Sequence, residues 1–450
     1  MSKAGALTDV RDQAANLEGL VARILDEAKQ QGASAAEVSV SGDVGLSVMV
    51  RNRELETVEF NNDRGFGITV YAGSRKGSAS TSDSSDGAIV DTVRAALNIA
   101  RYTEEDPCSG LAEAELMARD LPDLDLYYPW KIDVERAQAI ALESEAVALD
   151  FDPRIVNSEG AQVTSQRSYR VYGNSHGFLE GVAATRHSTS CVVIAQDGNG
   201  MQRDYWYTVA RDPSELESHV EIGKTAAERT LARLGSRPIA TGTFPVLFNP
   251  QMATGLIGHL IGAISGGSLY RKASYLLDSL GKTVIAPTIT LAERPHIAKA
   301  LGSAGFDGDG VATRAKGFVE NGVVSSYVLG SYSARRLGMQ TTANAGGVFN
   351  LEVACDDRAT PEELMQQMGT GLVVNELMGQ GINLVTGDYS RGAGGVWVEN
   401  GKPVHPVSEA TIAGNLNDIF SGIVGVGDDV DRRGNVHCGS LLVKAMTVAA

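Results

Sequence analysis

Val396-Trp397-Val398-Glu399-Asn400-Gly401-Lys402 places an Asn-Gly pair directly after a stretch of strand-forming residues. Asn and Gly tolerate the positive φ of a type I′ turn, so this pair predicts a β-hairpin. A second hairpin is predicted at Phe318-Val319-Glu320-Asn321-Gly322-Val323-Val324. Glycine is dense and strands dominate from about residue 241 onward. We therefore expect a barrel-like or sandwich-like β-rich domain over residues 238–450.

The residues before this domain follow two different periods. Apolar residues at positions i, i+3, i+4 and i+7 predict a helix over residues 17–28. Residues 37–41, 46–50 and 67–71 alternate in twos, which predicts an antiparallel meander. The polar stretch 61–65 is expected to form a turn between two of these strands.

A second helix should begin at Ser84, Ser85 or Asp86, because each side chain can accept a hydrogen bond from a free amide of the first turn. The same order of elements then recurs, with a helix, a strand-rich segment and a helix at 133–149, 155–209 and 214–234. Helices with intervening antiparallel strands predict an α+β fold rather than a parallel α/β sheet.

We therefore expect an N-terminal α+β domain over residues 1–237, built from helix–sheet–helix units at 1–110 and 130–237. In the domain that follows, Thr360-Pro361-Glu362-Glu363 predicts a helix start, with Thr as N-cap, Pro at the first helical position and Glu three residues after the cap.

The composition disfavours nucleic acid and membranes as partners. The 450 residues include 39 Lys and Arg against 55 Asp and Glu, giving a net charge of −16 that repels phosphate and anionic lipid. Residues 256–264, the longest apolar stretch, fall far short of the roughly 20 residues that span a bilayer. The N-terminus lacks the apolar core of a signal peptide, and no two of the four cysteines form a C-x-x-C pair. We expect a soluble, cytoplasmic protein.

The sequence carries no common metal-hydrolase motif. Such a motif pairs two histidines on one helix with a glutamate that activates water. None of the seven histidines is followed by Glu; the next residues are Gly177, Ser188, Val220, Leu260, Ile297, Pro406 and Cys438. We expect no catalytic residue, no metal ligand and no cofactor in this chain.

Two histidines merit an interpretation of their own. His437 and Cys438 could together suit zinc or nucleophilic catalysis, but neighbours on a strand point to opposite faces. We interpret them as a buried cysteine beside a surface histidine. His259 stands among apolar residues and is interpreted as a core or interface histidine.

The stretch 386–395 has the most suggestive composition for binding. Its four glycines let a backbone approach closely, and polar side chains stand between them. We name Asp388, Ser390, Arg391 and Gly392 as peptide-contact candidates. The alternative is a solvated glycine loop before the strand of Trp397.

Several stretches resemble the TldD/PmbA family of metalloproteases. They are 371–377, 387–392, 397–401 and 409–416, with a further fit at 64–67 and 306–311. The resemblance covers nearly the whole chain and is greatest to the PmbA-type members, also called TldE-type.

The resemblance implies a subunit without a metal site. The TldD-type subunits of this family carry an H-E-x-x-x-H helix and a cysteine near the C-terminus, and the PmbA-type subunits lack them. Here Gly258, His259 and Ala263 stand where the family has His, Glu and His. Cys438 does not match the family cysteine, since it lies too near the closing strand 441–448.

The resemblance also implies partners and substrates. It predicts a heterodimer with a TldD-type catalytic subunit that holds the divalent metal, expected to be zinc, and a homodimer when the chain is alone. The pair would enclose a chamber in which unfolded peptides are cleaved, for peptide-antibiotic maturation and antitoxin turnover.

Two alternatives stay open. One is an independently active peptidase with an unorthodox site drawn from His405, His437, Cys438 or the Asp388 stretch. The other is a modulator of DNA gyrase that acts by binding.

Overall fold

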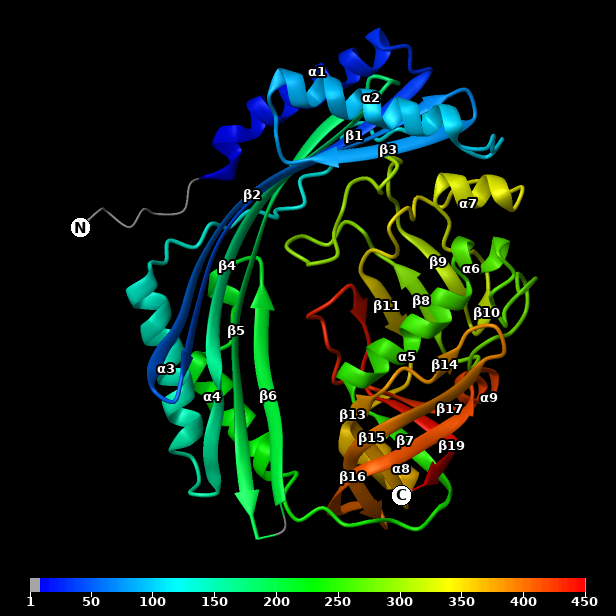
Figure 1. Ribbon diagram of the computed structural model, residues 1–450. Coiled ribbons are helices and arrows are strands. Elements are labelled where there is room, and N and C mark those ends of the chain that lie inside the picture. Colours follow the sequence, from blue (N-terminus) through cyan, green and yellow to red (C-terminus); the bar gives the residue numbers. More distant parts are fainter. Residues whose placement is uncertain (1–8, 199, 450) are drawn as a thin grey trace.

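The computed structural model describes residues 9–198 and 200–449. An N-terminal layer of helices and long strands curves around a β-rich C-terminal part, and one face of the long strands looks toward that part (Figure 1). The sheets are mainly antiparallel, so the predicted α+β fold is confirmed. Each helix in the described part of the chain is too short or too polar to span a bilayer.

The N-terminal layer contains one six-stranded sheet in the order β3-β2-β1-β4-β5-β6. The pairing of β1 with β4, from Glu37 opposite Asn174 to Val50 opposite Ala161, joins the strands of both predicted units in this sheet. The strands are β1 Ala35–Arg51, β2 Glu54–Ala72, β3 Arg75–Thr81, β4 Ile155–Asn174, β5 Leu179–Asp197 and β6 Gly200–Ala210.

Four helices cover one face of this sheet and leave the other face without helices (Figure 1). Two lie over one end of the sheet, α1 Ala14–Gln30 and α2 Asp86–Tyr102, and two over the other, α3 Val134–Leu149 and α4 His219–Leu231. The apolar stripe predicted for the first helix is buried, and Ser85 caps α2. Short 3-10 turns stand at Val10–Gln13, Ala114–Leu116 and Pro213–Glu215.

Two predictions in the first meander were wrong. Residues 37–41 and 46–50 belong to the single strand β1, and the expected turn at 61–65 lies inside β2, paired with residues 41–45. The chain turns instead at Asn52 and Arg53, whose φ values are 51° and 67°. Their amides donate to the two carboxylate oxygens of Glu145 at 2.9 and 2.7 Å, so a buried side chain of α3 holds this turn.

The C-terminal part contains a closed barrel, which is one of the two forms predicted for it, the other being a sandwich. Its strands are β7 Gly242–Phe248, β13 Gly371–Met378, β15 Asp388–Glu399, β16 Lys402–Asn415 and β19 Leu441–Ala449. The ring closes because β19 pairs with both β16 and β7. Three short strands extend it, β12 Arg358–Ala359, β14 Ile382–Asn383 and β17 Ile423–Gly427.

A five-stranded sheet in the order β10-β9-β8-β11-β18 lies beside the barrel. Its strands are β8 Thr290–Glu293, β9 Lys316–Glu320, β10 Val323–Val324, β11 Leu351–Ala354 and β18 Val436–His437. The helices of this part are α5 Pro250–Ala263, α6 Gly266–Tyr270, α7 Ser331–Arg336, α8 Pro361–Met368 and α9 Leu416–Ser421. One hydrophobic core joins α5, the barrel and this sheet.

The local turn predictions for this part are confirmed. Asn321 and Gly322 have φ values of 48° and 81°, and Asn400 and Gly401 have 51° and 73°, which are the positive values of type I′ hairpins. Thr360 and Glu363 form the full capping box at the start of α8.

Two arginines tie the sheet to the C-terminal part. Arg211 donates to the carbonyls of Ala300 and Leu301 at 3.1 and 2.9 Å. Arg433, in the segment before β18, donates to the carbonyl of Tyr207 on β6 at 3.0 Å. These hydrogen bonds hold the helix-free face of the sheet opposite the C-terminal part.

Candidate functional site

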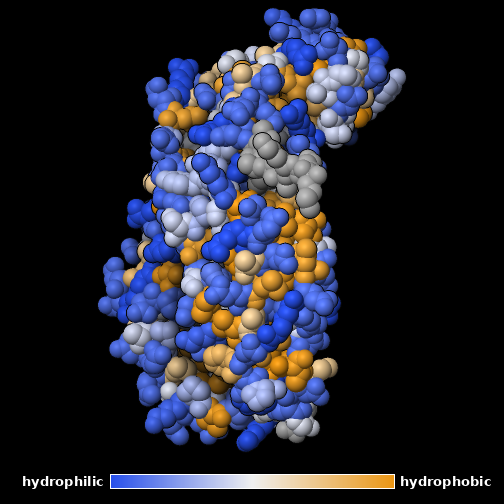
Figure 2. Space-filling model, turned by 90° about the vertical axis from the view of Figure 1, so that its left-hand side faces the viewer, coloured by the Kyte–Doolittle hydropathy of each residue, from blue (hydrophilic) through white to orange (hydrophobic). Residues whose placement is uncertain are grey.

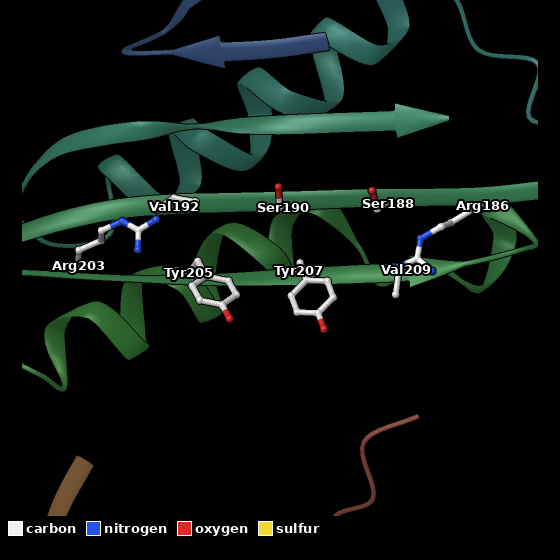
Figure 3. A pocket seen from close by; sticks show the side chains of 8 residues that line it. All are labelled: Arg186, Ser188, Ser190, Val192, Arg203, Tyr205, Tyr207 and Val209. Atoms are coloured by element: carbon white, nitrogen blue, oxygen red, sulfur yellow. The ribbon is translucent and has the colours of Figure 1, made fainter. Parts of the chain in front are cut away.

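The helix-free face of β5 and β6 carries a shallow hollow of about 370 Å³. The residues that line it are every second residue of each strand, so their side chains point to the same side of the sheet (Figure 3). They are Arg186, Ser188, Ser190, Val192, Arg203, Tyr205, Tyr207 and Val209.

This hollow offers hydroxyl groups, aromatic rings and positive charge. The rings of Tyr205 and Tyr207 stack with centroids 6.2 Å apart, and the Arg433 guanidinium lies 4.4 Å from the Tyr207 ring centroid. Arg203 pairs with Glu159, whereas Arg186 forms no ion pair among the described residues. No sequence prediction named this surface, although serines and tyrosines spaced by two residues on neighbouring strands were a signal for it.

The four peptide-contact candidates lie in β15 and not in a loop, so the alternative of a solvated loop was wrong. Glycine is needed there because β13 and β15 approach each other closely. A Cβ on Gly395 would stand 1.7 Å from the carbonyl oxygen of Val373 on β13. A bulge interrupts the pairing at this point. The glycines at this position shape the barrel rather than a loop.

The structure divides the four candidates between two faces of β15, with Asp388, Ser390 and Gly392 on one face and Arg391 on the other. Asp388 and Ser390 are exposed on one face, where Asp388 accepts a hydrogen bond from the Thr386 hydroxyl at 2.6 Å. Tyr389 and Arg391 occupy the other face, on the side of α5, where the rings of Tyr389 and His259 meet edge to face at 6.1 Å.

This second face is positively charged and holds unpaired polar atoms. Tyr389 is 2% exposed and its hydroxyl interacts with the Arg391 guanidinium, while the buried Nε of Arg391 has no hydrogen-bond partner among the described residues. Burial raises the pKa of Tyr389 to about 12, against the opposing effect of the Arg391 guanidinium. Burial and the same guanidinium lower the pKa of His259, so this imidazole is neutral near pH 7.

The positions that match the family's metal helix lie on α5. Gly258 is exposed, His259 is half-buried, and Ala263 is buried. No group of three or more His, Cys, Asp or Glu side chains in the described part of the chain could hold a metal ion. The residues present on α5 therefore do not fit a divalent metal.

The residues of the alternative peptidase site do not form such a group either. Cys438 is fully buried as predicted, and burial raises the pKa of its thiol, which makes it a poor nucleophile. His437 was predicted at the surface, but it is only 4% exposed, because β18 is paired in the five-stranded sheet. His405 lies on β16 and its Nδ1 contacts the Pro406 carbonyl at 3.0 Å.

Three family models match the chain. They are the PmbA/TldA metallopeptidase domain 1 at residues 36–100, the central domain at 127–234 and the C-terminal domain at 241–450.

PmbA relatives match over almost the full length, and a TldD relative matches over a shorter part. The chain is 48% identical to Metalloprotease PmbA of Escherichia coli O157:H7, covering 98% of each chain. It is 46% identical to a PmbA homologue of Haemophilus influenzae, covering 98% of this chain and 97% of the relative. It is also 21% identical to a TldD homologue of Buchnera aphidicola, over 63% of each chain.

Solved structures share the fold. A Bacteroides thetaiotaomicron protein named as a modulator of DNA gyrase superposes with a TM-score of 0.91 at 26% identity, over 97% of this chain and 99% of that one. TldE of Thermococcus kodakarensis gives a TM-score of 0.83 at 18% identity, over 96% and 100%.

Proposed function

Because the chain belongs to the PmbA/TldD family of metallopeptidases, we propose that it is a PmbA/TldE-type subunit that holds peptide for a catalytic partner. The partner is a TldD-type subunit, which carries the metal. The pair acts in the cytoplasm on unfolded peptides, including peptide-antibiotic precursors and antitoxins.

The observation that carries this proposal is the side-chain set of α5. Gly258 and Ala263 have no atoms that could bind a metal, and His259 alone cannot form a site that needs three protein ligands. The described residues offer no substitute set elsewhere. A chain of this family without ligands contributes binding rather than metal chemistry.

The helix-free face of the sheet supports peptide holding. β6 is hydrogen-bonded to a strand on one side only; on its other edge Arg433 binds the carbonyl of Tyr207, and other main-chain groups beside the hollow of Figure 3 have no strand partner among the described residues. An extended peptide can add to such an edge through main-chain hydrogen bonds, which do not depend on its sequence. Tyr205, Tyr207 and Ser190 would contact its side chains.

The edge of β2 supports association with a second subunit. β3 covers only residues 66–72 of β2, so the stretch before them has a free edge. Leu55, Val58 and Phe60 on that stretch are 44%, 36% and 56% exposed. Figure 2 shows apolar side chains gathered in the middle of the face on this side of the molecule. Free edges with apolar side chains are templates for pairing.

Metal analysis and light scattering test this proposal together. We expect the purified chain to hold less than stoichiometric zinc, to bind a labelled unfolded peptide without cleaving it, and to shift to the mass of a heterodimer when a TldD-type subunit is added. Stoichiometric zinc in the isolated chain, or no change of mass on mixing, would contradict it.

A further inference from the structure

We propose that Arg391, Tyr389 and His259 form a binding site for a carboxylate of the peptide, on the exposed side of α5. This inference rests on the proposed peptide-holding function. His259, one of the three positions that match the family's metal helix, would then contact an anion in place of a cation.

The first support is the unpaired charge of Arg391. Its side chain forms no ion pair with any described residue, and although the guanidinium interacts with the Tyr389 hydroxyl, its Nε is buried without a hydrogen-bond partner. Buried groups of this kind are costly unless they are paired. The planar guanidinium matches the two oxygens of a carboxylate, so that ligand would supply the missing acceptors.

The second support is the hydroxyl of Tyr389. The side chain is 2% exposed and its oxygen has no partner with normal hydrogen-bond geometry. A phenol can donate one hydrogen bond, and the neutral His259 imidazole, whose ring lies 6.1 Å from that of Tyr389, can donate another. A carboxylate accepts up to about four hydrogen bonds, enough for all three side chains.

The third support is access. Gly255 and Gly258 lie one helical turn apart on the exposed side of α5, and a Cβ added to either would meet no atom within 4 Å. The helix therefore presents open space beside His259. His259 and Arg391 are both half-buried, so a ligand can approach these two side chains from solvent.

The charge of this site selects an anion over a metal ion. The Arg391 guanidinium already lowers the pKa of His259, and no carboxylate contributes to that shift. A cation would meet the same repulsion without a counter-charge. A peptide can supply a carboxylate from its C-terminus or from an Asp or Glu side chain, and the test below distinguishes the two.

Peptide binding to the full chain provides the test. Three labelled unfolded peptides would share one sequence: a free C-terminal acid, its C-terminal amide, and the amide with one internal Gln replaced by Glu. We expect the acid to bind about ten-fold more tightly than the amide in fluorescence anisotropy. If the Glu peptide regains that affinity, a side-chain carboxylate is the ligand. Equal affinity of all three would overturn the carboxylate site while leaving peptide holding intact, and failure of every peptide to bind would overturn both.

Matched variants assign the effect to Arg391. Arg391→Gln should abolish the difference between acid and amide, whereas Arg314→Gln, at an exposed arginine without an ion pair in the same domain, should preserve it. A difference that survives in Arg391→Gln would overturn the assignment.

A measurement on the unmodified chain does not depend on how the variant folds. Sodium acetate, compared with sodium chloride at equal ionic strength, should raise the pKa of His259 in an NMR titration, because a bound carboxylate offsets the Arg391 charge. Assignment would use His259→Gln. An unchanged pKa in acetate would contradict the proposal.

Discussion

The N-terminal sheet and the C-terminal barrel are both largely antiparallel, yet different interactions set the register of their strands. In the barrel, the turn at Asn400-Gly401 is specified by the residues at those two positions. In the sheet, the turn at Asn52-Arg53 contains no glycine and depends on Glu145 of α3, more than 90 residues away in sequence. The barrel is thus locally encoded, while the sheet depends on tertiary contacts.

The two regions also differ in what they leave open. The barrel closes on itself, so its five strands have few free edges. The sheet keeps one face without helices and has free edges at β2 and β6. The free strand edges that could pair with a peptide or with a second subunit therefore belong to the sheet, whereas the proposed carboxylate site lies on β15 of the barrel and on α5.

The largest expected effect is that of Gly395→Ala in the barrel. The added Cβ would stand 1.7 Å from the Val373 carbonyl oxygen, so the strands must separate, and we expect a loss of about 3 kcal/mol or more in unfolding free energy. Gly67→Ala on β2 is the matched change in the sheet. It meets no atom within 4 Å and should be neutral or slightly stabilising. Chemical unfolding, monitored by circular dichroism, measures the unfolding free energy of both variants. Similar losses in the two variants would contradict the difference between barrel and sheet.

The next effect is that of Glu145→Gln. This change weakens two charge-assisted hydrogen bonds to the amides of Asn52 and Arg53, which should cost about 2 kcal/mol. Glu143→Gln, two residues away on α3, removes only an exposed pair with His219 and should cost less than about 1 kcal/mol. Equal stability of the two variants in urea would show that the turn does not need Glu145.

A smaller effect should accompany acidification. The pKa values of His187 and His437 lie below the ordinary value of 6.5, and burial is the largest cause in both. Below pH 6.5 the unfolded chain then binds more protons than the folded chain, so stability is full above that pH and falls as the pH drops toward the folded pKa values. Each unit of depression contributes about 1.4 kcal/mol. Urea midpoints between pH 7.5 and 5.5 measure this, and His437→Gln should flatten the slope; a flat profile for the unmodified chain would contradict the burial of these rings.

The smallest effect on folding, with a specific effect on assembly, is expected for Phe60→Lys. The side chain is 56% exposed on the free edge of β2, so folding should be almost unchanged. Association with a TldD-type subunit should weaken about ten-fold, since a charged edge resists pairing. Val156→Lys, 53% exposed on β4, is the control. Equal affinities of the two variants, measured by light scattering over a concentration series, would place the interface elsewhere.

The sequence predicted the features that neighbouring residues encode. The hairpins at Asn321-Gly322 and Asn400-Gly401 and the Thr360 cap depend on backbone preferences of a few residues, and the structure contains all three. The barrel-like fold followed from strand density.

The wrong sequence predictions concern features that depend on residues far away in the sequence. Residues 61–65 have turn composition, but pairing with β1 keeps them in a strand. The glycines before Trp397 resemble a loop until Val373 is known to lie against them. The burial of His437 depends on its pairing with β11, and the hollow on β5 and β6 appears only when two strands lie side by side. No sequence pattern predicted that His259 would lie beside Tyr389 and Arg391.

The most direct test of the central claim is cleavage of an unfolded peptide by this chain alone, by a TldD-type subunit alone and by both, each with and without a chelator. The account predicts cleavage in the mixture above the sum of the separate subunits, abolished by the chelator, and no chelator-sensitive cleavage by this chain alone. Chelator-sensitive cleavage by the purified chain, in proportion to its bound metal, would contradict it.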